Sequence, residues 1–326
     1  AGYLAVPDTG WTGTPEGNSE GTVGGKNISV IGKFPWKTLG TPPLRDGQGE
    51  CLWYVVSGHF KNGPPPDPPF NWDTPGQIDV IDIGGNTIAT NIAALIVAPG
   101  AALDAQDRSL ADPALAQCGG NYNARNYLDS HDLANAISGQ VNYFTGSPNN
   151  LVAPNAGTKQ FVSASNGHYN DRFLAVTVED VFRPIIRRSD FAGAIANLLD
   201  DPYFQTVTIA GPKGTDNVVC GSTGASNQAF CTHWKDMLLL TQLSPPSSIT
   251  IDGVPSPVCG RVLVFGGQRA AGQVRATAAD KSNKANYLEG SNLTAFGTPV
   301  ANSSNFNGVS AFTASNPSAD VVRCLP

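Results

Sequence analysis

The chain has 326 residues, with 20 Lys and Arg against 26 Asp and Glu and a formal net charge of −6. This balance offers no large basic surface, so nucleic-acid binding is not expected to be its main function. The length fits one large domain or two modest ones, and a hydrophobic fraction of 40% is enough for folded cores, which argues against a disordered chain.

Glycine and proline are frequent, with 36 and 25 residues, so we predict short strands separated by many turns. The first 50 residues are expected to be irregular. Gly84-Gly85-Asn86 separates two apolar runs and is a hairpin signal. In the first half of the chain, strands are predicted at 52–56, 78–83 and 87–97, with a proline-rich loop at 63–69.

The second half begins with a predicted strand at 173–178. Thr177-Val178-Glu179-Asp180 resembles a capping box, and the apolar spacing that follows predicts two consecutive helices over 179–200. Residues 266–326 are rich in Asn, Ser and Ala and are expected to form ordered loops with few elements of their own. Further strands are predicted at 205–210, 238–240, 249–251 and 262–265.

Two segments, 94–132 and 262–292, repeat the same order of features: an apolar strand, Gln-x-Arg, and then Asn-Tyr-Leu followed by an acid. We predict that Arg108 pairs with Asp129 and that Arg275 pairs with Glu289, so that each ion pair orders a long loop. A ligand site lined by Arg and carboxylate is the alternative. Two copies in one chain favour a scaffolding role over a single catalytic centre.

These patterns predict an α+β fold with a mainly antiparallel sheet, a short helical pair, long ordered loops and disulfides. The division we expect is a main globular domain at 1–250 and a strand-plus-loop region at 251–326 packed on it.

The six cysteines fit an oxidising compartment, because they form no metal knuckle or redox motif. Cys220 and Cys231 are close in sequence and suit a disulfide that closes a short loop. The pairing of the other four is left open, and their even number favours complete bridging; they are Cys51, Cys118, Cys259 and Cys324.

No catalytic motif is found, so an enzyme is not expected. Asp8-Thr9-Gly10 spells the aspartic-protease triplet, but a single chain of that class needs a second triplet, and a tight turn is the preferred interpretation. The histidines are scattered, and no nucleophile elbow or cofactor motif is present. No cofactor is predicted, although acids at Asp79, Asp82 and Asp104–Asp107 could hold calcium.

Several short blocks occur in a recognisable order. Their residues are Gly2-Tyr3-Leu4, Pro7-Asp8-Thr9-Gly10, Phe34-Pro35-Trp36-Lys37-Thr38-Leu39-Gly40, Asp46-Gly47, Gly49, Leu52-Trp53-Tyr54, Ala98-Pro99-Gly100 and Asn170-Asp171-Arg172-Phe173-Leu174-Ala175-Val176-Thr177, with the two Gln-x-Arg and Asn-Tyr-Leu-acid pieces. In this order they resemble bacterial type IV pilin-like and type II secretion pseudopilin-like proteins. The chain departs from that pattern at Ala5-Val6-Pro7, where a Cys often stands, and it lacks the hydrophobic N-terminal helix and its leader.

The resemblance implies a non-enzymatic filament subunit or tip component that acts in assembly or surface adhesion. Its partners would be similar subunits or copies of itself, joined through a helix that was removed or is supplied separately, and the membrane would be reached only through that helix. The resemblance implies a location on an extracellular or cell-surface filament or at the periplasmic face. Surface ligands would then contact exposed loops such as 63–69, the Cys220–Cys231 loop and the polar C-terminal third.

Two other functions stay open. A secreted carbohydrate- or protein-binding module would present an exposed aromatic platform. A secreted hydrolase would have a concave pocket with two convergent titratable groups. The candidates for the aromatic platform are Trp11, Trp36, Trp53, Trp72 and Trp234.

Overall fold

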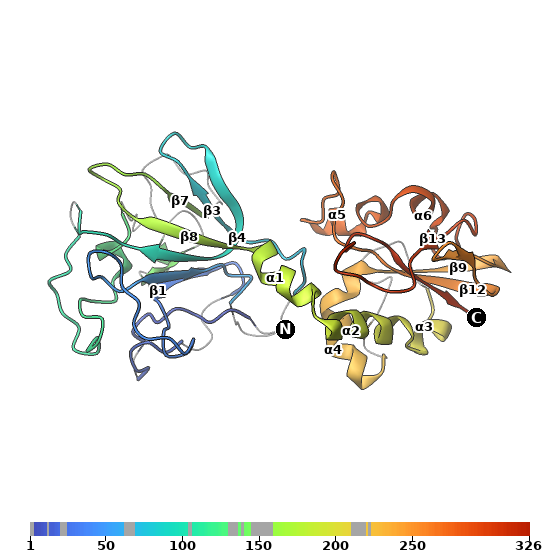
Figure 1. The fold of residues 1–326 in the computed structure, drawn as a ribbon, viewed down its shortest axis with the longest axis horizontal. Coiled ribbons are helices and arrows are strands. Elements are labelled where there is room, and N and C mark those ends of the chain that lie inside the picture. The colour runs from blue at the N-terminus through green and yellow to red at the C-terminus, as the bar shows by residue number, and fades with distance from the viewer. Residues whose placement is uncertain are drawn as a thin grey trace. The chain divides into compact units, whose positions relative to one another are not determined.

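The computed structural model divides the chain into two compact units (Figure 1). Unit 1 comprises Ala1–Asp67 and Pro75–Val181, and unit 2 comprises Pro68–Thr74 and Phe182–Pro326. The predicted α+β class with mostly antiparallel strands is confirmed. The structure describes residues 3–11, 13–19, 25–61, 69–103, 106–129, 136–137, 140–144, 159–209, 220 and 223–326.

Unit 1 is built on an eight-stranded sheet of order β5-β6-β1-β2-β4-β3-β7, with β8 also paired to β4. The pairing of β3 with β7 is parallel and the other pairings are antiparallel. The strands are β1 (Ser29–Lys33), β2 (Trp53–Val56), β3 (Ile78–Ile81), β4 (Thr87–Ala98), β5 (Ala136–Ile137), β6 (Gln140–Phe144), β7 (Lys159–Val162) and β8 (Arg172–Thr177).

Strand β4 lies at the centre of unit 1. Its residues 92–95 are buried in succession, as expected for a strand that is covered on both faces, and Leu95 packs in one core with Trp53 and Phe161. The predicted hairpin between β3 and β4 is present. In its turn Gly85 has φ +84°, and the Asp82 carboxylate accepts a hydrogen bond from the Asn86 amide at 2.8 Å.

The predicted helical pair is also present, as α1 (Val178–Ile186) and α2 (Ser189–Leu199). The Thr177 hydroxyl accepts from the Asp180 amide at 3.2 Å, while the Asp180 carboxylate accepts from the Thr177 amide at 3.0 Å. This reciprocal capping satisfies two amides at the start of α1 and fixes where the helix begins.

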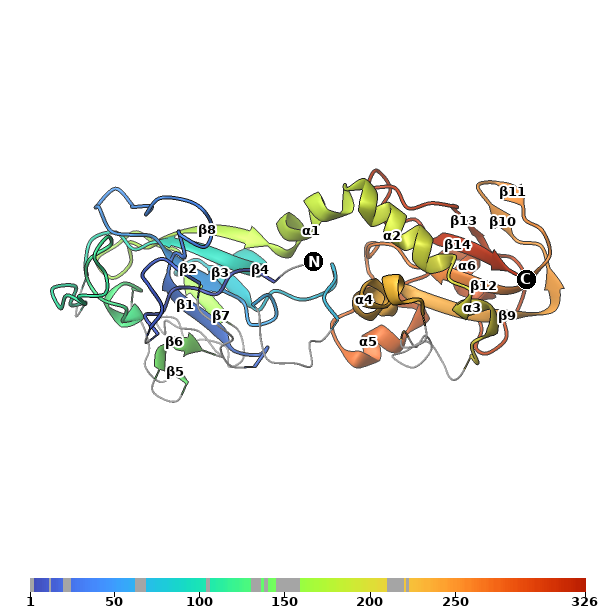
Figure 2. The same cartoon turned by 90° about the horizontal axis from the view of Figure 1, so that it is seen from below.

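Unit 2 contains a sheet of order β14-β12-β9 and a small sheet of order β11-β10-β13. Figure 2 shows α2 running along the β14-β12-β9 sheet, and α2 contacts both α4 and β12. The remaining elements are α3 (Tyr203–Thr206), α4 (Ala225–Trp234), β9 (Leu238–Ser247), β10 (Thr250–Ile251), β11 (Val254–Pro255), β12 (Cys259–Phe265), α5 (Ala278–Ser282), α6 (Gly290–Ala295), β13 (Asn307–Gly308) and β14 (Val321–Leu325), with 3-10 turns η1 (Ala124–Asn126, in unit 1), η3 (Lys235–Met237) and η4 (Lys284–Asn286).

The core of unit 2 is aromatic and includes a residue from far upstream in the sequence. The Trp72 ring lies 4.6 Å from Trp234 and 6.0 Å from Phe265, measured between ring centroids, and Trp72 is 5% exposed. Phe191 and Phe312 complete the cluster around it. The described part of the upstream segment, Pro69–Thr74, is called the strap below.

All six cysteines form disulfides, which pair Cys220 with Cys231 as predicted, Cys51 with Cys118, and Cys259 with Cys324. Disulfides of this number are typical of proteins in an oxidising compartment, which supports a location outside the cytoplasm. In the described part of the chain, no helix has the length and apolar character needed to cross a membrane.

Several predicted features differ from the structure. The predicted domain boundary at residue 250 lies within unit 2 and would separate β9 from its partner β12. The predicted strand at 205–210 is in part helical, because α3 ends only at Thr206, and residue 210 lies outside the described residues. Strands β1 and β14 occur in regions expected to be irregular or loop-rich.

Candidate functional site

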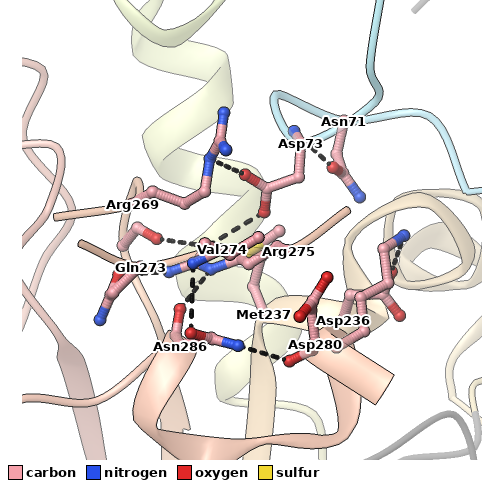
Figure 3. Close-up of polar contacts among 12 residues, drawn as sticks. Asn71, Asp73, Asp236, Met237, Arg269, Gln273, Val274, Arg275, Asp280 and Asn286 are labelled. Carbon is pink, nitrogen blue, oxygen red and sulfur yellow. Dashed lines mark hydrogen bonds and ion pairs between the residues drawn. The ribbon is translucent and has the colours of Figure 1, made fainter. Parts of the chain in front are cut away.

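The second Gln-x-Arg segment forms a loop after β12 that is held by the Arg275 guanidinium (Figure 3). Arg275 Nε donates to the Asn286 carbonyl, Nη1 donates to the Gly267 carbonyl at 3.0 Å, and Nη2 donates to Gln273 Oε1 at 3.2 Å. The guanidinium also stacks over the Tyr287 ring, 4.1 Å from its centroid. One side chain therefore ties the end of a strand to a loop and to η4.

The charge of Arg275 is balanced by Asp73 of the strap. The two side chains are 0% and 2% exposed, and Arg275 Nη1 lies 3.0 Å from Asp73 Oδ2. Arg269 Nε lies 3.1 Å from the other oxygen, Asp73 Oδ1. Burial raises the pKa of Asp73, and the charges of Arg275, Arg269 and Lys281 oppose that rise.

The first Gln-x-Arg segment repeats these bonds around Arg108 in unit 1. Arg108 Nε donates to the Asn126 carbonyl at 2.7 Å, Nη1 to the Gly100 carbonyl at 2.6 Å, and Nη2 to Gln106 Oε1 at 2.7 Å. The guanidinium lies 4.8 Å from the Tyr127 ring centroid. Each contact has its counterpart in unit 2, so the two segments share one three-dimensional motif.

The backbone around the two motifs matches as well. The amides of Asp107 and Val274 both donate to the side chain of the Asn that follows, Asn126 or Asn286, at 3.2 Å. Both η1 and η4 are capped by an Asn side chain, and the residue after each, Tyr127 or Tyr287, has φ −130°. We call this shared arrangement the arginine loop.

The structure corrects the predicted ion pairs. Gln106 Nε2 donates to Asp129 at 3.1 Å, and Gln273 Nε2 donates to Glu289 at 2.5 Å, so each Gln stands between the Arg and the acid. The Arg108 cation instead lies 3.6 Å from Glu50, as Arg275 pairs with Asp73. In each loop the Gln oxygen and two carbonyls accept hydrogen bonds from the guanidinium.

A buried acid that was not predicted stands beside each arginine loop, directly before β8 or β14. In unit 1, Asp171 Oδ2 accepts from the Asp129 amide at 2.9 Å, and Asp129 Oδ2 accepts from the Asp171 amide at 2.7 Å. Burial first, and then the charge of Asp129, raise the pKa of Asp171 well above its ordinary value.

The corresponding acid of unit 2 is Asp320. Its Oδ2 accepts from Asn292 Nδ2 at 2.7 Å, and Asp320 is 8% exposed. Burial raises the pKa of Asp320 to about 7; the charge of Glu289 adds to the rise, whereas the Asn292 bond and the charge of Arg275 oppose it. A signal was present in the sequence, because Asp320 directly precedes the apolar pair Val321-Val322 and Asp171 is separated only by Arg172 from the apolar run 173–176.

A cavity of about 550 Å³ lies beside Asp320, and its described lining includes Asp252, Glu289, Asn292 and Asn307. The described lining has three carboxylates and no Lys or Arg. Such a lining offers acceptors to the hydroxyl or ammonium groups of a polar ligand.

The acids considered for calcium bind nearby groups. Asp79 Oδ1 accepts from the Thr90 hydroxyl, Asp82 from Asn86, and Asp107 from Ser109. Asp104 and residue 105 lie outside the described residues. Within the described ranges, no group of three or more His, Cys, Asp and Glu side chains is arranged to hold a metal ion.

Two of the loops proposed as ligand surfaces are described only in part, because residues 63–68 of the first loop and 221–222 of the Cys220–Cys231 loop lie outside the described residues. Comparison of the chain with protein-family models, curated proteins and solved structures gives no match.

Proposed function

We propose that the chain is a non-enzymatic subunit or tip component of an extracellular filament of the type IV pilus or type II secretion kind, which acts in assembly or surface adhesion. The observation that carries the proposal is the use of polar groups in the arginine loops. In both units the Arg side chain donates to backbone carbonyls, and the Gln and Asn side chains accept from backbone amides of the same unit. Such bonds stabilise long loops that carry exposed surface.

The proposal assigns the chain to the outside of the cell, where three disulfides are stable. Its partners are similar subunits, or copies of itself, joined through a hydrophobic N-terminal helix that lies outside the given sequence. The resemblance of the short N-terminal and central sequence blocks to pilin-like proteins supports this choice.

Two experiments test the proposal. The encoding frame upstream of Ala1 should carry a short basic leader and about 20 apolar residues, and the intact mass of the native chain should include that apolar segment. Immunogold labelling should then place the protein on sheared surface filaments, with a strain that lacks the gene as the control. A conventional secretory signal ending at Ala1, with label only in the medium, would contradict the proposal.

A secreted binding module is the second candidate, and the cavity beside Asp320 favours it. The predicted aromatic platform does not support it, because Trp53, Trp72 and Trp234 are at most 5% exposed. Trp11 is 64% exposed, and Trp36 is partly buried. Calorimetric titration with neutral sugars and amino sugars tests this candidate, with Asp320→Asn as the matched variant.

A further inference from the structure

The strap belongs to unit 2 but is joined on both sides to unit 1. The chain leaves unit 1 after Asp67, contributes Pro68–Thr74 to unit 2, and returns to unit 1 at Pro75. The strap therefore reaches its partners without any short covalent connection to them, since Asp73 and Arg275 are 202 positions apart in the chain. Within unit 2 it is bound as a separate peptide would be.

The strap is a turn that is closed by its own hydrogen bonds. The Asp73 amide donates to Asn71 Oδ1 at 2.9 Å, the Thr74 amide to the Asn71 carbonyl at 2.9 Å, and the Asn71 amide to Thr74 Oγ1 at 3.0 Å. A peptide that holds its bound shape through internal bonds loses less conformational entropy on binding.

The apolar anchor of the strap is Trp72. Its ring lies among the aromatic rings of α2, α4 and β12, including Phe191 at 6.1 Å and Trp234 at 4.6 Å. Phe70 adds a second contact, with its ring 5.4 Å from that of Phe182. A buried aromatic anchor in a ring-lined pocket is the feature that dominates binding energy at protein interfaces.

The polar end of the strap is recognised equally closely. Asp73 meets two guanidinium groups, those of Arg275 at 3.0 Å and Arg269 at 3.1 Å. Asn71 Nδ2 donates to the His233 carbonyl at 2.8 Å. The receptor formed by residues 182–326 thus selects a turn that presents an aromatic side chain directly followed by an acid.

We propose that this receptor also accepts the strap of a second copy of the chain, so that exchange of straps links copies to one another. The exchanged strap makes the same contacts with the receptor as the chain's own strap, so the choice between the two depends on effective concentration rather than on contact energy. The occupant is the second copy, because the sequence that fits the receptor is present in every copy. The proposal does not rest on filament membership, although a filament would hold many copies close together.

The first experiment tests whether the receptor binds the strap as a separable ligand. A synthetic peptide of residues 69–75 is added to the full-length Trp72→Ala variant, whose own strap lacks the anchor. We expect a rise of the melting temperature of roughly 5 °C at saturating peptide. A peptide carrying the Asp73→Asn change should need at least about tenfold more peptide for the same rise.

A second strap variant allows peptide binding to be measured even if Trp72→Ala does not fold. If Trp72→Ala does not fold, the full-length Asp73→Asn variant takes its place, because it keeps the aromatic anchor. Trp11→Ala is the matched control, since Trp11 is 64% exposed and lies outside the receptor, and the peptide should leave its melting temperature unchanged. Absence of any shift in both strap variants would overturn the proposal.

The second experiment tests exchange between copies. The Trp72→Ala chain keeps the receptor, and an Arg275→Met chain keeps an intact strap but has a defective receptor. Incubating the two together just below their melting temperatures should give a complex of two chains by light scattering, whereas each variant alone stays monomeric. No complex on mixing, despite a positive peptide result, would overturn exchange between copies, and neither outcome bears on the filament experiments.

Discussion

The two arginine loops share their hydrogen bonds but differ in the source and burial of the counter-ion. In unit 1, Arg108 faces Glu50 at 3.6 Å, and the two side chains are 9% and 28% exposed. In unit 2, Arg275 faces Asp73 at 3.0 Å, and the side chains are 0% and 2% exposed. A charge that is removed from water depends on its partner far more than one that water can screen. Substitutions in the ion pair should therefore destabilise the arginine loop of unit 1 less than that of unit 2.

The two units also differ in the residue that stands just before the strand next to each arginine loop. In unit 1 this residue is Cys51, two positions before β2, and its disulfide with Cys118 ties that strand to the segment that carries the arginine loop. Directly before β9 in unit 2 stands Met237, whose sulfur lies 3.1 Å from Arg275 Nη1. Unit 1 thus secures its loop with a covalent bond, and unit 2 secures its loop with the strap.

The largest expected effect comes from removing the guanidinium. Arg275→Met leaves buried Asp73 with its ion pair to the half-exposed Arg269 and removes the donors to two carbonyls, so we expect a loss of about 4 kcal/mol. Arg108→Met should cost about 2 kcal/mol, because Glu50 remains hydrated. Urea denaturation gives the total change, and hydrogen exchange of each unit assigns it. If the two variants lose equal amounts of stability, burial of the counter-ion does not determine how strongly the protein depends on each arginine.

The next effect is a change in the pH dependence of stability through Asp320. Its pKa of about 7 in the folded chain lies above the ordinary value of 3.8, so the folded state binds the proton more tightly. The contribution of Asp320 to stability is therefore full below about pH 4 and is lost as the pH rises to 7, by at most about 4 kcal/mol. Asp320→Asn cannot ionise and keeps an oxygen for Asn292, so the fall between pH 4 and pH 7 should become smaller by the contribution of Asp320.

The control for this variant is Asp252→Asn, which changes an exposed carboxylate of the same cavity. The pKa of Asp252 is lowered by its bonds to Ser310, so its removal should not abolish the fall between pH 4 and 7. Unfolding measured at pH 4 and pH 7 checks both variants. If Asp320→Asn keeps the wild-type pH dependence, the acid does not titrate in that range.

The sequence predicted the elements whose pattern is local. The β3–β4 hairpin and the capping box of α1 depend on residues within a few positions of one another, and both are present. Strand β1 was missed because it contains Gly32 and Lys33, which suggest a turn and an exposed side chain. In the structure a Cβ at Gly32 would lie 2.4 Å from the Asp8 carbonyl, and Lys33 is buried over the Tyr127 ring.

The same distinction applies to the site. The sequence repeat aligns Gln106 with Gln273, and in the structure each Gln Oε1 accepts from Nη2 of the Arg in its loop. The counter-ions could not be found in this way, because they lie outside the repeat and differ between its copies. Asp73 is 202 positions from Arg275, and no local rule connects two residues at that separation.

Removing the disulfide of unit 1 tests whether it stabilises the Arg108 loop as the strap stabilises the Arg275 loop in unit 2. The Cys51→Ala, Cys118→Ala double variant opens a loop of 67 positions, for which we expect a loss of about 3 kcal/mol. Hydrogen exchange should rise first around the Arg108 loop. The disulfide between Cys259 and Cys324 closes a loop of similar length, 65 positions, and its double alanine variant is the matched control. Equal exchange around Arg108 in both variants would contradict a specific role for the first disulfide.

The smallest expected effect is that of Glu50→Gln. The pair with Arg108 is long and partly hydrated, so its loss should cost no more than about 1 kcal/mol, and the cost should shrink in high salt.

Glu50 has a second role, because its charge is the largest influence that opposes the lowering of the Lys33 pKa to about 8 by burial. Glu50→Gln should therefore lower the pKa of Lys33 further, so that stability gains more as the pH rises through 8.

Asp73→Asn, the matching change in unit 2, should cost about 3 kcal/mol with little dependence on salt. If Glu50→Gln costs as much as Asp73→Asn, the exposed pair is as essential to its loop as the buried one, and the difference between the two units lies elsewhere.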